Sequence, residues 1–259
     1  AASHAGLRGL QLAECAVALV VGVTLMLAPG VGTGFAVAGM TSARGRSHTF
    51  VGRAVGYARG EACGGVALRV PADEAALSLR GSAVRQDGRS ASLTAPNGQA
   101  QQGLLRAALG DATVTEDAIG LGEAHGTGTA LGDPIEAGAV AAAVASKRSS
   151  GQALVMGGVK ANLGHGESTA GATGLLKVAA ALAHGEAAPN AQLRSLNPHV
   201  GGALRSVRLG LPVQSTLLIA DETRAGGVSS FGYAGTIAHS AVRHGGRLVE
   251  MVPVLLEYR

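Results

Sequence analysis

The chain alternates between short apolar runs, rich in valine, leucine and glycine, and longer alanine-rich stretches with helical spacing. The short runs are typical of strands buried in a sheet. They predict strands at residues 16–27, 63–70, 77–84, 118–124, 153–159, 226–229 and 236–242, with weaker ones at 207–211 and 216–220. The longer stretches predict helices at residues 99–109, 133–147 and 168–184. Strands that alternate with helices predict a layered α/β fold.

Local signals at two of the predicted helices add detail. Asp133 precedes Pro134, and Glu136 follows, so we expect the Asp133 carboxylate to cap the second helix. Gly171 and Gly174 lie within the third helix, where residues without a side chain indicate close packing against another element.

Composition supports a packed core and excludes several classes of function. The 259 residues are 47% hydrophobic, 15% charged and 2% aromatic, with 41 glycines and no tryptophan. The formal net charge is +4, but the basic residues form no long block beside aromatic residues, so nucleic-acid binding is not expected. The most apolar run, residues 16–29, is shorter than the ~20 residues of a membrane-spanning helix, so no span is expected.

The two cysteines, Cys15 and Cys63, are too few for a disulfide framework. They indicate a reducing compartment, for which we expect the cytoplasm. Because both lie in apolar surroundings in the sequence, we expect them to be inert residues of the core.

The residues with chemical potential gather in two glycine-rich stretches, each with one histidine. Residues 123–136 read Glu-Ala-His-Gly-Thr-Gly-Thr-Ala-Leu-Gly-Asp-Pro-Ile-Glu and contain His125, and residues 158–165 read Gly-Val-Lys-Ala-Asn-Leu-Gly-His and contain His165. Each stretch follows a predicted strand, where α/β folds usually place ligands, and the glycines allow close approach. Neither has the ligand spacing of a zinc site, so no metal is expected.

Lys160 allows two interpretations. A buried lysine can act as a general base, but a charge-pairing role is the commoner one, with Glu167 as its nearest plausible partner in the sequence. The histidines outside the two stretches are expected to be structural or surface residues.

A third stretch of the same character spans residues 227–236 and reads Gly-Val-Ser-Ser-Phe-Gly-Tyr-Ala-Gly-Thr. Four more precede the histidines: Gly-Arg-Ser-His-Thr-Phe at 45–50, Gly-Tyr-Ala-Arg-Gly-Glu-Ala-Cys-Gly at 56–64, Gln-Asp-Gly-Arg at 86–89 and Leu-Thr-Ala-Pro-Asn-Gly-Gln at 93–99. Together, in this order, they strongly resemble the β-ketoacyl synthase (ketosynthase) family, in the form found in modular polyketide synthases and animal-type fatty acid synthases.

The resemblance implies a thiolase-like fold, with five αβαβα layers made of two related halves, and a homodimer. The chain would then hold the end of the first half, residues 1–85, and the second half, residues 86–246. Residues 247–259 would be a tail or the start of a linker.

The resemblance also implies roles for individual residues. His125 and His165 match the two catalytic histidines of the family. Thr127 and Thr129 match threonines near the bound phosphopantetheine arm. The set is completed by polar residues that support the second histidine and by an aromatic residue beside the acyl pocket, namely Lys160, Asn162 and Phe231.

Ketosynthases join an acyl chain held on a cysteine to a malonyl unit held on an acyl carrier protein. The partners implied are therefore the acyl carrier protein and acyl and malonyl thioesters, with the phosphopantetheine arm as carrier and no other cofactor. Carbon dioxide loss generates an enolate, whose oxygen needs hydrogen-bond donors such as two imidazoles.

The sequence departs from the family in four places, one of which is the stretch from Val70 to Leu79, shorter than the usual connector of the family. No cysteine stands at the nucleophile position, which the spacing would put a few residues before Ala1, so we expect the isolated chain to be inactive in condensation. Ala234 and Ile237 replace the usual glycine and asparagine. The alternative to a ketosynthase fragment is a non-catalytic thiolase-fold subunit that binds acyl carrier protein, similar to a chain-length factor.

Overall fold

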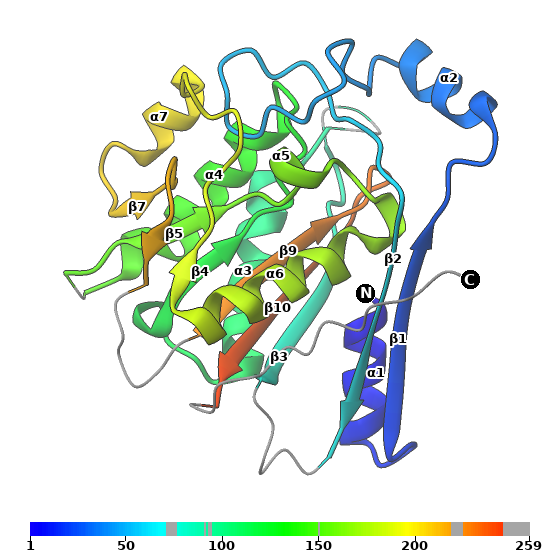
Figure 1. The fold of residues 1–259 in the computed structure, drawn as a ribbon. Coiled ribbons are helices and arrows are strands. Elements are labelled where there is room, and N and C mark those ends of the chain that lie inside the picture. The colour runs from blue at the N-terminus through cyan, green and yellow to red at the C-terminus, as the bar shows by residue number, and fades with distance from the viewer. Residues whose placement is uncertain (71–76, 91, 93–94, 150, 219–224, 246–259) are drawn as a thin grey trace.

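The structure is a computed structural model that describes residues 1–70, 77–90, 92, 95–149, 151–218 and 225–245. A six-stranded sheet with the order β3-β10-β9-β4-β5-β7 runs through its centre (Figure 1). Strands β9, β4, β5 and β7 run parallel to one another, and β10 pairs antiparallel with both β9 and β3. The six strands are β3 (Leu77–Gln86), β4 (Ile119–Glu123), β5 (Leu154–Gly157), β7 (Leu209–Gly210), β9 (Ala225–Phe231) and β10 (Thr236–His244).

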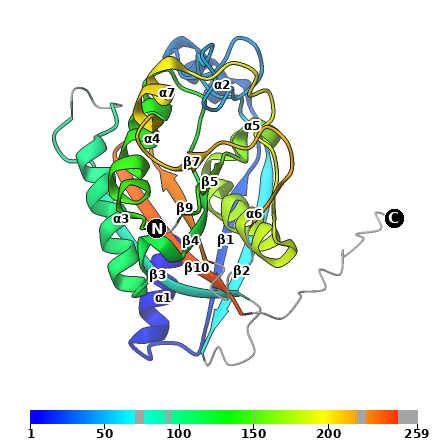
Figure 2. The same cartoon turned by 90° about the vertical axis from the view of Figure 1, so that its left-hand side faces the viewer.

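Helices cover both faces of this sheet (Figure 2). One face carries α3 (Gly98–Ala112) and α4 (Gly132–Ala143), with α7 (Pro198–Leu204) against α4. Their apolar side chains form a core with those of the sheet, including Leu105, Leu109, Val140, Leu154 and Met156. The other face carries α6 (Ala170–His184), which packs on β9, β4 and β10.

A second sheet consists of β1 (Val17–Thr24) and β2 (Ala62–Arg69), paired antiparallel. Helix α1 (Ala2–Gln11) contacts both β1 and β3, and α6 contacts both β2 and β9. These two helices therefore lie between the two sheets. The resulting order of helices, sheet, helices and sheet supplies four of the five αβαβα layers that the sequence predicts.

The remaining elements are short. Helix α2 (Pro29–Val37) lies between β1 and β2 in the sequence, and α5 (Lys160–Leu163) follows β5. Strands β6 (Glu186–Ala187) and β8 (Thr216–Leu217) pair with each other, and 3₁₀ turns cover Glu116–Ala118, Ala145–Lys147 and Glu167–Thr169. None of the described helices combines the length and the hydropathy needed to cross a membrane.

The ends and the packing of the helices follow from particular residues. The Asn97 side chain accepts hydrogen bonds from the backbone N–H groups of Gln99 and Ala100, at 3.0 and 3.2 Å, and so begins α3. Helix α6 ends at His184 and is followed by Gly185, whose φ of +69° suits glycine. A side chain at Gly174 would lie 3.1 Å from both Glu123 and Val228, which confirms the close packing predicted there.

All nine predicted strands and all three predicted helices are confirmed, with ends that shift by a few residues. Residues 219–220 of the last weak strand and the expected tail at 247–259 lie outside the described residues. Helices α1, α2, α5 and α7 were not predicted. Helices α2, α5 and α7 are short, and glycines hide the periodicity of α2 and α7, whereas α1 is amphipathic and could have been found. The boundary expected at residues 85 and 86 stays a prediction.

Two predictions about burial are wrong. The first strand is not buried, since Val17, Leu19, Val21 and Val23 are 49 to 73% exposed. The reason is that α1 covers one face of the β1–β2 pair, while no described residue covers the other. Cys15 and Cys63 are both exposed rather than parts of a core, Cys63 because its position alternates onto this same outer face.

The predicted cap at Asp133 is also wrong. Helix α4 begins at Gly132, one residue earlier, and its N-cap residue Leu131 makes no side-chain hydrogen bond to the helix. The Asp133 carboxylate instead accepts hydrogen bonds from the N–H groups of Phe50 and Gly128. The helix ends at Ala143, and the residues up to Lys147 form a 3₁₀ turn.

The contact between β3 and α3 supplies a test of the fold. A Cβ atom at Gly81 would lie 2.3 Å from the backbone nitrogen of Ala112, and backbone cannot yield as a side chain can. We expect Gly81→Ala to lower the free energy of unfolding by about 2 kcal/mol, as overpacking does. The matched control is Gly120→Ala in β4, where no atom lies within 4 Å and a change within about 0.5 kcal/mol is expected. Denaturant unfolding of the chain measures both; equal effects would contradict the packing described.

Candidate active site

Three neighbouring parallel strands deliver the glycine-rich stretches to one edge of the sheet. Glu123 at the end of β4 pairs in register with Gly157 of β5 and with Val228 of β9. Because parallel strands end at the same edge, the loops after β4 and β5 and the end of β9 meet there (Figure 1).

The two histidine rings lie side by side at this edge. The ring centroids of His125 and His165 are 5.5 Å apart, at an interplanar angle of 82°. The Phe231 ring lies 5.4 Å from that of His125, and the Tyr57 ring lies 4.9 Å from that of His165. The structure therefore brings together three residues that the sequence predicted separately, and adds Tyr57.

Backbone hydrogen bonds decide where each imidazole carries its proton. The Phe231 N–H donates to Nδ1 of His125 at 3.2 Å. The Glu167 N–H donates to Nδ1 of His165 at 2.9 Å. Because Nδ1 is an acceptor in both rings, each neutral imidazole carries its proton on Nε2. Both histidines are therefore Nε2–H donors.

Both imidazoles are also held in the neutral form. Burial lowers the pKa of His165 to about 3, and the positive charge of Lys160 acts in the same direction. Burial lowers the pKa of His125 well below its usual value, with further lowering by Lys160 and by His165. Two neutral imidazoles in a buried site can donate hydrogen bonds to a negatively charged oxygen, and neither has to change its protonation state first.

Two buried carboxylates hold the loop that carries His125. Glu136 accepts hydrogen bonds from the N–H groups of His125 and Gly126, at 2.7 and 2.8 Å. Asp133 accepts from Gly128 at 3.1 Å and from Phe50 at 2.7 Å. Burial raises the pKa of Asp133 to about 6 and that of Glu136 to about 7, against the effect of these donors.

Glu123 joins the two histidine loops. One oxygen of its carboxylate accepts the Val159 N–H at 2.5 Å, and the other pairs with the Lys177 ammonium at 2.7 Å. Lys160 is buried beside this group. Burial lowers the pKa of Lys160, and the nearby carboxylates of Glu123, Glu136 and Asp133 offset only part of this effect. The suggested pairing of Lys160 with Glu167 is wrong, because Glu167 pairs with Arg59 instead.

The segment before β2 packs against the loop that carries His125. The Thr49 hydroxyl donates to the Gly126 carbonyl at 2.7 Å, and the Gly56 N–H donates to the Gly128 carbonyl at 3.0 Å. Gly128 has a φ of +81°, and a Cβ there would lie 2.6 Å from the backbone nitrogen of His48. Glycine is therefore required at this position by both conformation and space.

The other predicted site residues take part in local contacts. The hydroxyl oxygens of Thr127 and Thr129 are 3.4 Å apart, and that of Thr129 accepts the Gly132 N–H at the start of α4. The exposed Asn162 side chain donates to the Pro189 carbonyl at 3.2 Å. No group of three or more His, Cys, Asp or Glu residues in the described chain is arranged to hold a metal ion.

Sequence reasoning missed the residues that support the histidines. Tyr57 and Arg59 lie in a stretch that the sequence singles out only by its resemblance, and Glu123 opens the first histidine stretch without a predicted role there. A signal exists, because charged residues are rare in this apolar chain and so are candidates for buried pairs. Their partners, however, are brought together only by the fold.

Family models match most of the chain in two parts. The model "Beta-ketoacyl synthase, N-terminal domain" matches residues 1–73, and "Beta-ketoacyl synthase, C-terminal domain" matches residues 77–194.

Among curated proteins, one subunit of the phenolphthiocerol/phthiocerol polyketide synthase of Mycobacterium tuberculosis is 38% identical over 250 residues, which are 94% of this chain and 13% of that protein. A spectinabilin polyketide synthase protein of Streptomyces orinoci is 41% identical over 247 residues, 92% of this chain and 7% of that protein. The chain thus spans a small part of these relatives.

Solved structures agree in fold. The ketosynthase from module 6 of the bacillaene synthase of Bacillus subtilis 168 superposes with a TM-score of 0.86 at 31% identity, covering 93% of this chain and 44% of that one. An oxazolomycin ketosynthase domain of Streptomyces albus gives a TM-score of 0.87 with the same identity and coverage. The predicted thiolase-like fold is confirmed, and the chain belongs to the β-ketoacyl synthase family, in its polyketide synthase branch.

Proposed function

We propose that this chain supplies the enolate-stabilising part of a ketosynthase that catalyses decarboxylative condensation in polyketide synthesis. One observation carries the proposal: a backbone N–H occupies Nδ1 of each histidine, so that two neutral imidazoles offer Nε2–H donors from adjacent positions. Two fixed donors to one oxygen are what an enolate requires.

In the proposed reaction, the malonyl thioester loses carbon dioxide. The electron pair of the broken carbon–carbon bond moves to the thioester oxygen, where His125 and His165 stabilise the resulting enolate. The enolate carbon then attacks the acyl thioester on a cysteine, so that a carbon–carbon bond forms and the cysteine leaves as thiolate. Both histidines stay neutral throughout, as their lowered pKa values allow.

The substrates would be delivered by an acyl carrier protein on its phosphopantetheine arm, with Thr127 and Thr129 beside the arm. Phe231, whose ring lies 5.4 Å from that of His125, would border the acyl pocket. Lys160 and Asn162 would support the loop of His165, and the whole enzyme would be a homodimer.

The spacing of the family would put the nucleophilic cysteine of the proposed enzyme a few residues before position 1. A cavity of about 120 Å³ supports this location, because Ala1 and Ala2 line it together with Gly171 and Ser230, the residue before Phe231. Ala1 therefore lies across this cavity from the segment whose Phe231 ring is 5.4 Å from that of His125. The same pair argues against a non-catalytic partner subunit, in which two donors for an enolate would have no use.

Removal of either imidazole tests the role of the pair. In a version of the enzyme that carries the cysteine, we expect His125→Ala and His165→Ala each to slow malonyl decarboxylation about 100-fold, equivalent to the ~3 kcal/mol of one oxyanion donor. His184→Ala, at the exposed end of α6, is the matched control and should keep the normal rate. Release of labelled carbon dioxide measures all three, and a near-normal rate in either site variant would refute the role.

The protonation state of His165 supplies a second test. Since its pKa is about 3, the imidazole should stay neutral between pH 8 and pH 5, and its ring ¹⁵N chemical shifts should not move. By linkage, this residue lowers the stability of the fold as the pH falls from about 6.5 towards 3, because only the unfolded chain takes up the proton there. A titration midpoint between about pH 6 and 7 would contradict the assignment.

The two exposed thiols supply a third test. We expect no stable acylation of Cys15 or Cys63 when the chain is incubated with an acyl-carrier thioester, because neither matches the nucleophile of the family. Intact mass measures the product, and alkylation by iodoacetamide shows that both thiols are accessible, as their exposure requires. Stoichiometric acylation of either residue would overturn the location proposed for the nucleophile.

A further inference from the structure

The proton position in His165 depends on a single peptide unit, the one that joins Gly166 to Glu167. Its N–H donates to Nδ1 of His165 at 2.9 Å. If this peptide rotated, Nδ1 would lose its donor, and the neutral ring could carry its proton there instead of on Nε2. The orientation of one peptide plane therefore decides whether His165 is a donor towards the site.

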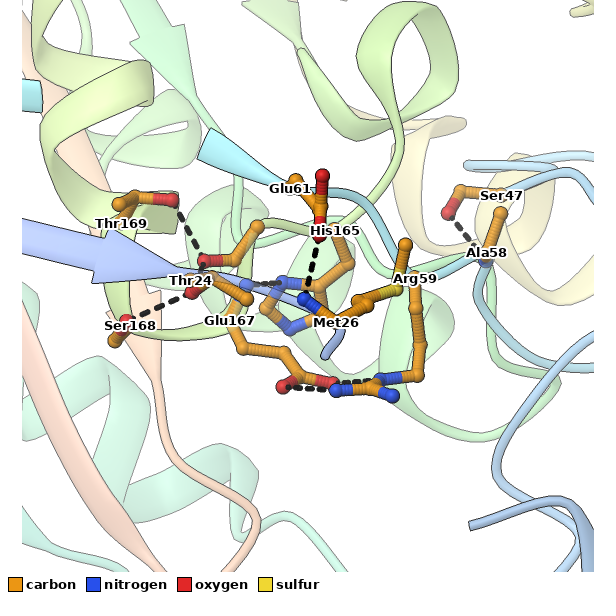
Figure 3. A network of polar contacts seen from close by, with 11 residues as sticks. Thr24, Met26, Ser47, Ala58, Arg59, Glu61, His165, Glu167, Ser168 and Thr169 are labelled. Carbon is orange, nitrogen blue, oxygen red and sulfur yellow. Dashed lines mark hydrogen bonds and ion pairs between the residues drawn. The ribbon is translucent and has the colours of Figure 1, made fainter. Parts of the chain in front are cut away.

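The carbonyl of the same peptide is held from two directions. The Thr24 hydroxyl, at the end of β1, donates to the Gly166 oxygen at 2.6 Å (Figure 3). Thr169 donates to the same oxygen through its hydroxyl at 2.6 Å and its N–H at 2.8 Å. Thr169 belongs to the same turn, whereas Thr24 comes from the other sheet and so ties the peptide to a separate element.

Glu167 completes this arrangement in an unfavourable conformation. Its φ is +37°, in the left-handed region that residues with a side chain rarely adopt. Such a conformation persists only when surrounding contacts enforce it.

The contact that can enforce it is the ion pair with Arg59. The guanidinium donates to the two carboxylate oxygens of Glu167 from Nε at 2.7 Å and from Nη2 at 3.1 Å (Figure 3). Both side chains are largely buried, at 13% and 27% exposed, and Arg59 also lies 5.4 Å from the Phe35 ring. A two-point contact of this kind fixes direction as well as distance.

Arg59 is itself in register with His165. The His165 N–H donates to the Ala58 carbonyl at 2.7 Å, and the Gly60 N–H donates to the His165 carbonyl at 3.0 Å. The backbone of His165 and the side chain of Glu167 are thus both held by residues 58–60. The ion pair and the imidazole are therefore fixed relative to each other.

We propose that Thr24 and Arg59 are positioning residues that lock the Gly166–Glu167 peptide and thereby keep the proton of His165 on Nε2. The Thr24 hydroxyl bonds to the carbonyl of this peptide and to the Ser168 hydroxyl of the same turn, and the Arg59 guanidinium bonds to the Glu167 carboxylate. Both side chains therefore act on the imidazole through this turn. The proposal rests on the proposed function for its catalytic consequence, but the proton position can be measured without any activity.

The first experiment reads the proton position directly. Two-bond ¹H–¹⁵N correlation spectra of ¹⁵N-histidine-labelled chain give the tautomer of His165, with His165→Ala for assignment. We expect Thr24→Val and Arg59→Gln each to convert part of the ring population to the Nδ1–H form, and the double variant to convert more. Thr24→Ser restores the hydroxyl and should restore the Nε2–H form.

Matched controls are Thr33→Val, which removes a hydroxyl bonded to a backbone carbonyl in α2, and Arg8→Gln, which breaks the ion pair with Asp111. Neither should change the tautomer. A double variant that stays fully in the Nε2–H form, or controls that shift it equally, would overturn the proposal. Far-UV circular dichroism shows whether each variant is folded. If the double variant fails to fold, the comparison of Thr24→Ser with Thr24→Val still tests the proposal, because these two variants differ in whether residue 24 has a hydroxyl group.

The second experiment uses the cysteine-containing enzyme. We expect kcat for malonyl decarboxylation to fall about 10-fold or more in Thr24→Val and Arg59→Gln, with KM within about twofold, because a misplaced donor affects the transition state. A tautomer shift without any change in kcat, together with full activity of His165→Ala, would refute the proposed function but not the positioning role of Thr24 and Arg59. If the tautomer of His165 is unchanged in these variants, the positioning role of Thr24 and Arg59 is refuted, whatever the activity.

Discussion

The hydrogen bond from a backbone N–H to Nδ1 of each site histidine is the interaction on which the rest of the site depends. It turns a ring with two possible proton positions into a donor with one. Phe231 supplies it to His125 from the end of β9, and Glu167 supplies it to His165 from the turn before α6. A donor fixed before the reaction costs no reorganisation when charge develops, which is why such geometry is effective in catalysis.

The sheet and the buried charges serve this geometry. Parallel strands β4, β5 and β9 end at one edge and bring the three stretches together. Glu136 and Glu123 accept hydrogen bonds from backbone N–H groups in the two histidine loops. Burying these N–H groups without a partner would lower the stability of the fold. Lys160 and Lys177 balance part of this negative charge, and Lys160 also helps to keep both imidazoles neutral.

Much of this fold could be predicted from the sequence, because strand and helix patterns are local. The helices α3, α4 and α6 and the strands that precede the histidines follow from apolar periodicity and glycine punctuation. The proximity of His125, His165 and Phe231 was also accessible, since stretches that follow parallel strands meet at one edge.

The pattern could not predict the contacts between distant segments. Asp133 resembles a helix cap locally but bonds to Phe50, and Glu167 lies near Lys160 in the sequence but pairs with Arg59. The first strand was expected to be buried from its valines alone, although burial depends on what covers each face.

The most direct measurement is a crystal structure of the cysteine-containing enzyme with a stable analogue of the malonyl thioester. We predict that the thioester carbonyl oxygen, where the enolate charge develops, lies within ~3 Å of Nε2 of both His125 and His165, with both Nδ1 atoms still bonded to backbone N–H groups. A complex in which that oxygen contacts only one imidazole, or neither, would contradict the shared role of the two histidines.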